Sequence, residues 1–275
     1  FSTVLKRALL VLLAGYILNF CKFVLPAMLN LLPAGMYAEL QVHRDLAGYL
    51  HLLLTGDILQ FAGIALLVLC LVLKLPRYPL WALVFALAVC FGSPFLYGLH
   101  CKNVYVGYLL ELLAGQPPRV FFPVLPWLMY PLIGLVIGYY LKKEKPLLFG
   151  YGMLAGIALM VISCAPWMPY AKQFDASFYR TYPSGSFYHI GIVLIWLYLA
   201  HWLSVNAYRH HRLLFKFFDF ISRHITLVYC VQWILICWSL PMIGFRVLGL
   251  AGSVIAAILF TALTVLVTLV LLLLF

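Results

Sequence analysis

The sequence predicts an all-α protein that is a polytopic bundle of membrane-spanning helices. Three observations lead to this fold class. Hydrophobic residues make up 66% of the chain, charged residues only 9%, and the mean hydropathy is +1.08. Apolar runs of about 20 residues recur along the chain, and each is long enough as a helix to cross a hydrocarbon core of about 30 Å. We therefore expect an integral membrane protein rather than a soluble one.

Hydropathy, together with the positions of Pro, Gly and charged residues, predicts about eight spans in one domain. We place the spans near residues 8–25, 57–73, 79–97, 121–141, 147–165, 186–205, 224–240 and 250–275. No fixed-period repeat or low-complexity linker divides them, so residues 1–275 are expected to form a single transmembrane domain. The apolar run that follows Phe1 continues into a full span, unlike a signal peptide, and further helices are expected upstream.

The distribution of Lys and Arg predicts that both ends of the chain are cytoplasmic. With the N-terminus inside, the inner loops collect the larger share of these residues, and Lys22 falls among the outer ones. The inner set comprises Lys6, Arg7, Lys74, Arg77, Lys142, Lys143, Lys145, Arg209, Arg212, Lys216 and Arg223. The formal charge of +11 would suggest nucleic acid as the partner of a soluble chain. Here loops and lipid headgroups account for it, so we expect membrane lipid and no nucleic acid.

The fourth span begins with a cluster of prolines, in the stretch "FFPVLPWLMYPLIGLVIGYYLKKEK". Proline fixes φ and removes a backbone donor, and the hydrocarbon core supplies no water to repair the loss. Pro123, Pro126 and Pro131 therefore predict that protein or an aqueous cavity satisfies the freed carbonyls near one face of the membrane.

Small residues four apart occur in the fourth and fifth spans, as Gly134 with Gly138 and Gly152 with Gly156. This spacing lets helix backbones approach closely. It predicts a tight antiparallel pair of these two spans, although Gly-rich spans also produce the spacing by chance.

Asp57 and Gln60 lie three residues apart at the start of the second span, on one helical face. Polar groups inside a span are candidates for function, because the membrane makes them costly unless they have partners. A carboxylate here could orient a histidine or bind a sugar hydroxyl. The alternative is that Asp57 is the N-cap of the helix, as Thr55-Gly56-Asp57 suggests.

His189 lies near the outer end of the sixth span, beside the outer loop at 166–185. Imidazole is well suited to general-base catalysis near neutral pH. An interfacial hydrogen-bonding role is the alternative. His201 lies twelve residues further on, about 18 Å along a helix at 1.5 Å per residue, so the two histidines cannot share one site.

A basic segment between the sixth and seventh spans includes Arg209, Arg212 and Lys216. Such a segment usually follows the positive-inside rule and contacts anionic lipid. It could also hold a polyanion such as the phosphates of coenzyme A, through charge-assisted hydrogen bonds. The seven cysteines and the neighbouring His210-His211 do not have the spacing of a zinc site, and we expect no metal.

In the seventh span, Tyr229 and Gln232 share one helical face. A phenol and an amide within the bilayer need partners. They either form hydrogen bonds between helices or line a cavity.

Three segments resemble a known family. "DILQFAGIALLVL", "FFPVLPWLMYPLIGLVIG" and "ISRHITLVYCVQW" resemble, in this order, segments of the transmembrane acyltransferase superfamily. The similarity is to bacterial relatives of heparan-α-glucosaminide N-acetyltransferase and, more distantly, to acyltransferase family 3. It implies an enzyme of the bacterial cytoplasmic membrane. The enzyme would take an acyl group, usually acetyl from acetyl-CoA, on the cytoplasmic side and pass it to a hydroxyl or amine of an envelope glycan outside.

The resemblance also implies roles for the candidate residues. His189 is the best local candidate for the base, and Asp57 and Gln60 would orient it or the acceptor. Trp127 would shape the outer cavity mouth, with Tyr229 and Gln232 further along the cavity. Arg209, Arg212 and Lys216 would hold the CoA phosphates.

The chain departs from the family at two points. Nothing matches the family's segment R-x-x-x-x-D-x-x-R-G with the histidine that follows it, and Phe1–Phe20 resembles the family's third span. The resemblance then implies either that the catalytic histidine lies in helices upstream or that the protein is not catalytic. Gln232 stands where a family pattern has histidine, and an amide cannot shuttle a proton at neutral pH.

Two further expectations concern function class and partners. The alternative function is a transporter or flippase for a lipid-linked or small polar substrate, which broken helices and interior polar residues would also suit. For the enzyme we expect a glycan acceptor and membrane lipid as partners, with a homodimer as an optional assembly.

Overall fold

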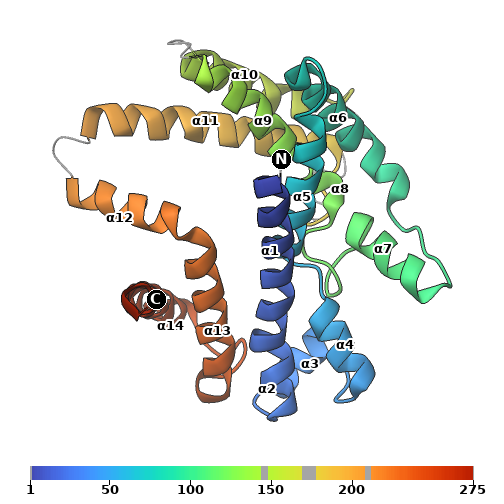
Figure 1. Ribbon diagram of the computed structural model, residues 1–275, viewed down its shortest axis with the longest axis vertical. Coiled ribbons are helices and arrows are strands. Elements are labelled where there is room, and N and C mark those ends of the chain that lie inside the picture. The colour runs from blue at the N-terminus through green and yellow to red at the C-terminus, as the bar shows by residue number, and fades with distance from the viewer. Residues whose placement is uncertain (1, 144–147, 169–177, 208–211, 275) are drawn as a thin grey trace. The chain divides into compact units, whose positions relative to one another are not determined.

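The computed structural model describes residues 2–143, 148–168, 178–207 and 212–274, and in these ranges the secondary structure is helical apart from one isolated bridge between Gly56 and Val120 (Figure 1). Six of the described helical stretches are long and apolar enough to cross a membrane. They cover Thr3–Met28, Tyr78–Leu96, Val124–Lys142, Pro183–Asn206, Ile225–Ile243 and Leu250–Leu274. The predicted fold class, a polytopic helical membrane protein, is confirmed.

Each of the eight predicted spans coincides with a described helix. The helices at these spans are α1 (Ser2–Asn19) with its continuation, α5 (Ile58–Val72), α6 (Tyr78–Gly92), α9 (Met129–Lys142), α10 (Leu148–Ser163), α11 (Pro183–Ala207), α13 (Ile225–Ile243) and α14 (Leu250–Leu274). The continuation of α1 comprises a π-helical segment, η1 (Phe20–Val24), and α2 (Leu25–Met28). Helices α6 and α9 are extended by neighbouring helical segments to the full lengths given above, whereas α5 and α10 remain shorter apolar helices.

Shorter helices occupy the connections between the spans. They are α3 (Ala34–Leu40), α4 (Leu46–Leu54), α7 (Val104–Ala114) and α12 (Arg212–Arg223). Two further short segments belong to spans: the 3₁₀ turn η2 (Ser93–Leu96) continues α6, and α8 (Val124–Trp127) precedes α9. Helix α12 is amphipathic. Its charged residues Lys216, Asp219 and Arg223 are three and four residues apart and therefore share one face, and Leu and Phe residues form the other.

The chain divides into two compact units, and each is described by itself. Unit 1 comprises Phe1–Leu13 and Gly56–Tyr208, and unit 2 comprises Ala14–Thr55 and Arg209–Phe275. The structure does not define the position of one unit relative to the other.

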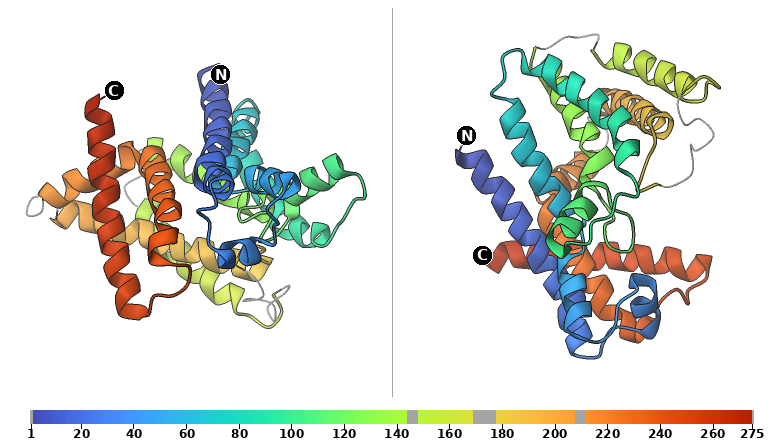
Figure 2. Two further views of the ribbon diagram at one scale, coloured as in Figure 1. Left: turned by 90° about the horizontal axis from the view of Figure 1, so that it is seen from below. Right: turned by 90° about the vertical axis from the view of Figure 1, so that its right-hand side faces the viewer.

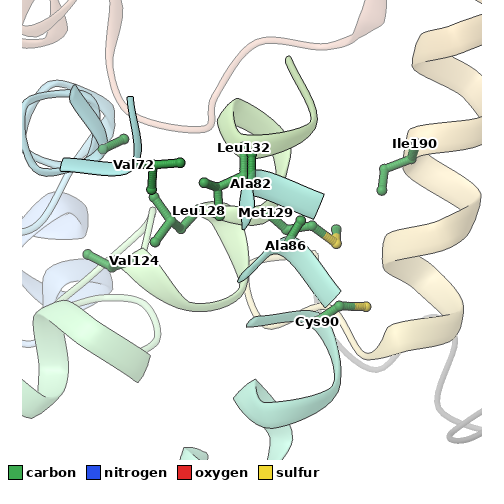
Figure 3. Close-up of a cluster of buried hydrophobic side chains, with 10 residues drawn as sticks. Val72, Ala82, Ala86, Cys90, Val124, Leu128, Met129, Leu132 and Ile190 are labelled. Carbon is green, nitrogen blue, oxygen red and sulfur yellow. The ribbon is translucent and has the colours of Figure 1, made fainter. Parts of the chain in front are cut away.

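The core of unit 1 forms where α6, α9 and α11 meet (Figure 3). Ala82, Ala86 and Cys90 recur every four residues and therefore share one face of α6, and all three are fully buried. Met129 and Leu132 of α9 pack against this face of small side chains. The small residues let the two helices lie close together, and this contact fixes where α9 begins.

Helices α10 and α11 approach most closely at two glycines. A Cβ atom added at Gly156 would lie 2.7 Å from the carbonyl oxygen of Gly191, and one added at Gly191 would lie 2.6 Å from that of Gly156. Only glycine fits at both positions, because real Cβ atoms do not come so near to a backbone oxygen.

The predicted tight pair of the fourth and fifth spans is wrong. Added Cβ atoms at Gly134, Gly138 and Gly152 would meet nothing within 4 Å, and Gly156 faces α11 rather than α9. Glycine spacing marks a face on which a helix can be approached, but it does not specify the partner.

Unit 2 holds the end of α1 from Ala14 onward together with η1, α2–α4 and α12–α14. Helices α13 and α14 contact each other, and α14 runs across α13 rather than alongside it (Figures 1 and 2). The amide Nδ2 of Asn19 donates to the carbonyls of Leu53 and Thr55, at 3.0 and 2.8 Å, and so satisfies the end of α4.

Candidate functional site

The candidate site in unit 1 is centred on His189 of α11 and Tyr130 of α9. The Tyr130 hydroxyl and His189 Nδ1 are 3.1 Å apart, which is hydrogen-bond distance. Both side chains are half-buried. The predicted histidine therefore has a partner on a neighbouring helix, from a residue that is 59 positions away in the chain.

A set of hydroxyl groups continues from Tyr130. The hydroxyls of Thr181 and Ser186 lie near its phenol, and their own oxygens are 2.9 Å apart. Thr181 and Ser186 are buried, with exposed fractions of 2% and 0%. These two hydroxyls bond to each other at the start of α11, because each can both donate and accept.

Aromatic side chains surround the His189–Tyr130 pair. The Trp127 ring lies 5.5 Å from that of Tyr130 and 5.4 Å from that of Phe178, and Phe178 lies 6.1 Å from the His189 ring. Trp127 Nε1 donates to the carbonyl of Tyr179 at 3.0 Å. Trp127, predicted to line a substrate cavity, is thus brought to the histidine, and its indole N–H holds the segment that precedes α11.

The prolines of the fourth span explain why Trp127 and Tyr130 lie here. Helix α8 contains a non-helical residue, Leu125, and ends at Trp127, and α9 begins two residues later. Pro123 and Pro126 are fully buried, so protein rather than water surrounds the break. The interruption redirects the chain before α9.

Arg180 fixes the segment next to Thr181. Its Nε donates to the carbonyls of Ala114 and Gly115, at 2.9 and 3.0 Å, and its guanidinium lies 5.3 Å from the ring centre of Tyr97. Burial lowers the pKa of the Arg180 guanidinium and raises the pKa of the Tyr97 phenol. Arginine stays charged and tyrosine neutral under these shifts, so both keep their hydrogen bonds across the physiological range. Tyr97 donates to the Thr181 carbonyl at 2.9 Å.

Asp57 and Gln60 form a capping box at the start of α5. The Asp57 carboxylate accepts from the Ile58 N–H at 2.7 Å and from the N–H of Gln60, and Gln60 Oε1 accepts from the Asp57 N–H at 3.2 Å. The N-cap interpretation of Asp57 is confirmed. The Gln60 side chain is 1% exposed, and within the described ranges its Nε2 has no partner.

A second cluster lies in unit 2, around Lys22 in the π-helical segment. The Lys22 side chain is 1% exposed, and its Nζ lies 4.6 Å from the ring centre of Phe23 and 4.8 Å from that of Trp233. Lys22, which the sequence places near the outer end of the first predicted span, is therefore buried within the first helical stretch. π-Helical turns recur at functional sites, and an ionisable residue inside a span is a functional candidate.

Tyr229 and Gln232, the other predicted cavity residues, lie on α13 in unit 2. Both are half-buried, and the Tyr229 ring lies 6.2 Å from that of Trp233, which also contacts Lys22. These two residues thus neighbour the Lys22 cluster. The structure does not place them relative to His189.

The predicted coenzyme A residues are only partly described. Arg209 lies outside the described residues, and so does the side chain of Arg212, whose backbone begins α12. Lys216 is exposed on α12. Among the described residues no group of three or more His, Cys, Asp and Glu could hold a metal ion.

Comparison with known proteins places the chain in a family. A family model described as heparan-alpha-glucosaminide N-acetyltransferase, catalytic, matches residues 2–162, which is more than half of the chain. The chain belongs to this family. Membership indicates a membrane acetyltransferase, and the family implies acetyl-CoA as the donor. Neither the curated proteins nor the solved structures that were compared include a match.

The N-acetyltransferase family match covers α1–α10 apart from the last residue of α10, and it contains Lys22, Asp57, Gln60, Trp127 and Tyr130. His189 lies beyond it. Sequence reasoning missed Lys22 and Tyr130 as candidates. Lys22 could have been found as an ionisable residue within the first apolar run, and Tyr130 as a phenol one helical turn after Trp127.

Proposed function

We propose that this protein transfers an acetyl group from cytoplasmic acetyl-CoA to a hydroxyl or amine of a glycan on the outer side of a bacterial cytoplasmic membrane. The observation that carries the proposal is the His189–Tyr130 pair, set in an aromatic cluster at one end of α9 and α11 in a member of an acetyltransferase family.

His189 is proposed as the general base. For Nε2 to accept a proton, Nδ1 must carry one and donate to the Tyr130 oxygen. The Tyr130 oxygen then accepts from Nδ1, and its own O–H can point toward the nearby hydroxyls of Thr181 and Ser186. The contact with Tyr130 thus supports the tautomer that catalysis needs.

The reaction follows from this arrangement. Nε2 takes the proton of the acceptor O–H or N–H while the acceptor atom attacks the thioester carbonyl carbon and forms a C–O or C–N bond. The tetrahedral intermediate then breaks its C–S bond, and the CoA thiolate receives the proton from the imidazolium. The products are the acetylated glycan and free CoA.

The orientation that we propose places the His189 end of unit 1 outside and the Lys142 end inside. Lys142 lies in the last turn of α9 and Lys143 is its C-cap, with Lys143 Nζ 4.4 Å from the ring centre of Tyr139. The excess of Lys and Arg on this side supports the proposal. Arg209, Arg212 and Lys216 would bind the phosphates of the donor.

Calorimetry with acetyl-CoA tests the donor site. We expect the complete protein to bind acetyl-CoA, and the Arg209→Ala/Arg212→Ala/Lys216→Ala variant to bind it about tenfold or more weakly, a loss of about 1.4 kcal/mol or more. The control is Lys142→Ala/Lys143→Ala, which also removes basic residues at a helix end and should bind normally. Absence of binding to folded wild-type protein would contradict the acetyl-CoA proposal, and normal binding by the triple variant would contradict the placement of the donor.

A further inference from the structure

Unit 1 contains an apolar groove between α9 and α11 that begins at Tyr130. Its volume is about 310 Å³, which is within the range of small-molecule sites. The lining residues are Tyr130, Ile133, Gly134, Ile137, Gly138, Leu141, Ile190, Val193, Leu194 and Leu197. Between Tyr130 and Leu141 the helix rises about 16 Å, at 1.5 Å per residue. The groove is therefore long and narrow.

Gly134 and Gly138 create this space. Both are exposed, and a Cβ atom added at either would meet nothing within 4 Å. They are spaced one turn apart on the face of α9 that lines the groove. The small residues that sequence analysis assigned to helix packing instead leave room for a ligand.

The lining limits the chemistry of that ligand. Apart from the Tyr130 hydroxyl at one end, its side chains are aliphatic or absent. The amides of a pantetheine arm or the hydroxyls of a sugar would lose their hydrogen bonds to water there without replacement. A hydrocarbon chain has no such groups and would bury its surface along the whole length.

The two ends of the groove differ in polarity. Its polar end is Tyr130, which contacts His189, and its other end is aliphatic, at Leu141 and Leu197. Val193, Leu197 and Leu141 are partly exposed, with exposed fractions of 48%, 37% and 42%, so the side of the groove is open where the spans would face lipid. An amphiphile could enter laterally from the bilayer, with its head at the histidine and its chain toward Leu141.

We propose that the groove binds the hydrocarbon chain of a membrane lipid that carries the acetyl acceptor in its headgroup. The acceptor would then be a lipid-linked glycan rather than a free one. This inference rests on the proposed function, in which His189 deprotonates the acceptor. It adds the class of substrate, and it assigns Gly134 and Gly138 to chain binding.

The test uses glycine variants that fill the groove. Gly134→Leu/Gly138→Leu adds two isobutyl groups to it. The matched control is Gly150→Leu/Gly152→Leu, because these two glycines of α10 also have nothing within 4 Å of an added Cβ and do not line the groove. Thermal unfolding and oligomeric state are recorded for each variant.

The first readout is acetyl transfer to dodecyl glucosaminide and to methyl glucosaminide, which share a headgroup and differ in chain. For the wild type we expect the dodecyl compound to have the higher kcat/KM. The Gly134→Leu/Gly138→Leu variant should lose at least tenfold in kcat/KM for the dodecyl compound and little for the methyl compound. Equal losses with both acceptors, or none, would overturn the proposal.

The second readout is binding, and it does not need activity. In nanodiscs, a phosphatidylglycerol with a photoreactive acyl chain should cross-link to α9 or α11, and dodecyl glucosaminide but not methyl glucosaminide should reduce the labelling. The groove variant should lose the labelling and the control should keep it. Labelling without transfer would refute the proposed function but keep the chain site. Labelling that dodecyl glucosaminide leaves unchanged, or a changed oligomeric state in the groove variant alone, would overturn the inference.

Discussion

Replacing His189 with alanine is expected to lower kcat for acetyl transfer by about a hundredfold to ten-thousandfold, the range for loss of a general base. The reason is that Nε2 of His189 is the proposed proton acceptor, held in place by the contact of Nδ1 with Tyr130. Tyr130→Phe removes only the positioning hydroxyl, so it should lower kcat by about tenfold, or about 1.4 kcal/mol, with little change in KM.

The control for this prediction is His201→Ala. His201 lies on the same helix and stacks on Phe149, with ring centres 4.0 Å apart, but it is not in the candidate site. It should retain the wild-type rate. Steady-state kinetics with acetyl-CoA and a panel of amino sugars and envelope glycans measures all three variants. A wild-type rate for a folded His189→Ala variant would contradict the assignment of His189 as the base.

Alanine at Gly156 or Gly191 is expected to give a large loss of stability by separating two membrane helices. Each added Cβ would lie within 2.7 Å of a carbonyl oxygen of the opposing helix, and a backbone oxygen cannot move aside as a flexible side chain can. Helices α10 and α11 must therefore separate, at a cost of about 1–3 kcal/mol or more in the free energy of unfolding.

The matched substitution is Gly152→Ala, one turn earlier on α10, where an added Cβ meets nothing within 4 Å. Alanine there should be neutral or stabilising by up to about 1 kcal/mol, because it is the better helix former. Thermal unfolding in detergent compares the variants. Equal melting temperatures for Gly152→Ala, Gly156→Ala and Gly191→Ala would show that the close approach of α10 and α11 is absent from the folded protein.

Much of the helix pattern could be predicted from the sequence, because apolar length and the positions of charges and prolines determine spans locally. The capping box of Asp57 and Gln60 could also be predicted from the sequence, since its residues are three apart. Contacts between helices could not be predicted. The partner of His189 is 59 residues away, and the partner of Gly156 is on α11 rather than on α9.

Lys22 illustrates a different limit. Hydropathy places Lys22 near the end of the first span but does not predict that its side chain is buried, with Nζ close to the rings of Phe23 and Trp233. Phe23 is the next residue, whereas Trp233 is more than 200 positions away in the chain. No local pattern contains that information.

The family match favours the acetyltransferase over the transporter or flippase that the same broken helices and interior polar groups had allowed. The two functions differ in what crosses the membrane. A transporter moves its substrate unchanged, whereas the proposed enzyme releases free CoA on one side and an acetylated acceptor on the other.

The most direct test therefore uses sealed vesicles that contain the complete protein, with radiolabelled acetyl-CoA inside and two kinds of amino-sugar acceptor outside, a lipid-linked oligosaccharide in the outer leaflet and an impermeant free oligosaccharide. The account predicts labelled, acetylated oligosaccharide outside, formed in the wild type and strongly reduced in His189→Ala. Transfer that occurs only when donor and acceptor share a compartment would contradict transfer across the membrane. No transfer to any acceptor by folded protein would contradict the acetyltransferase itself.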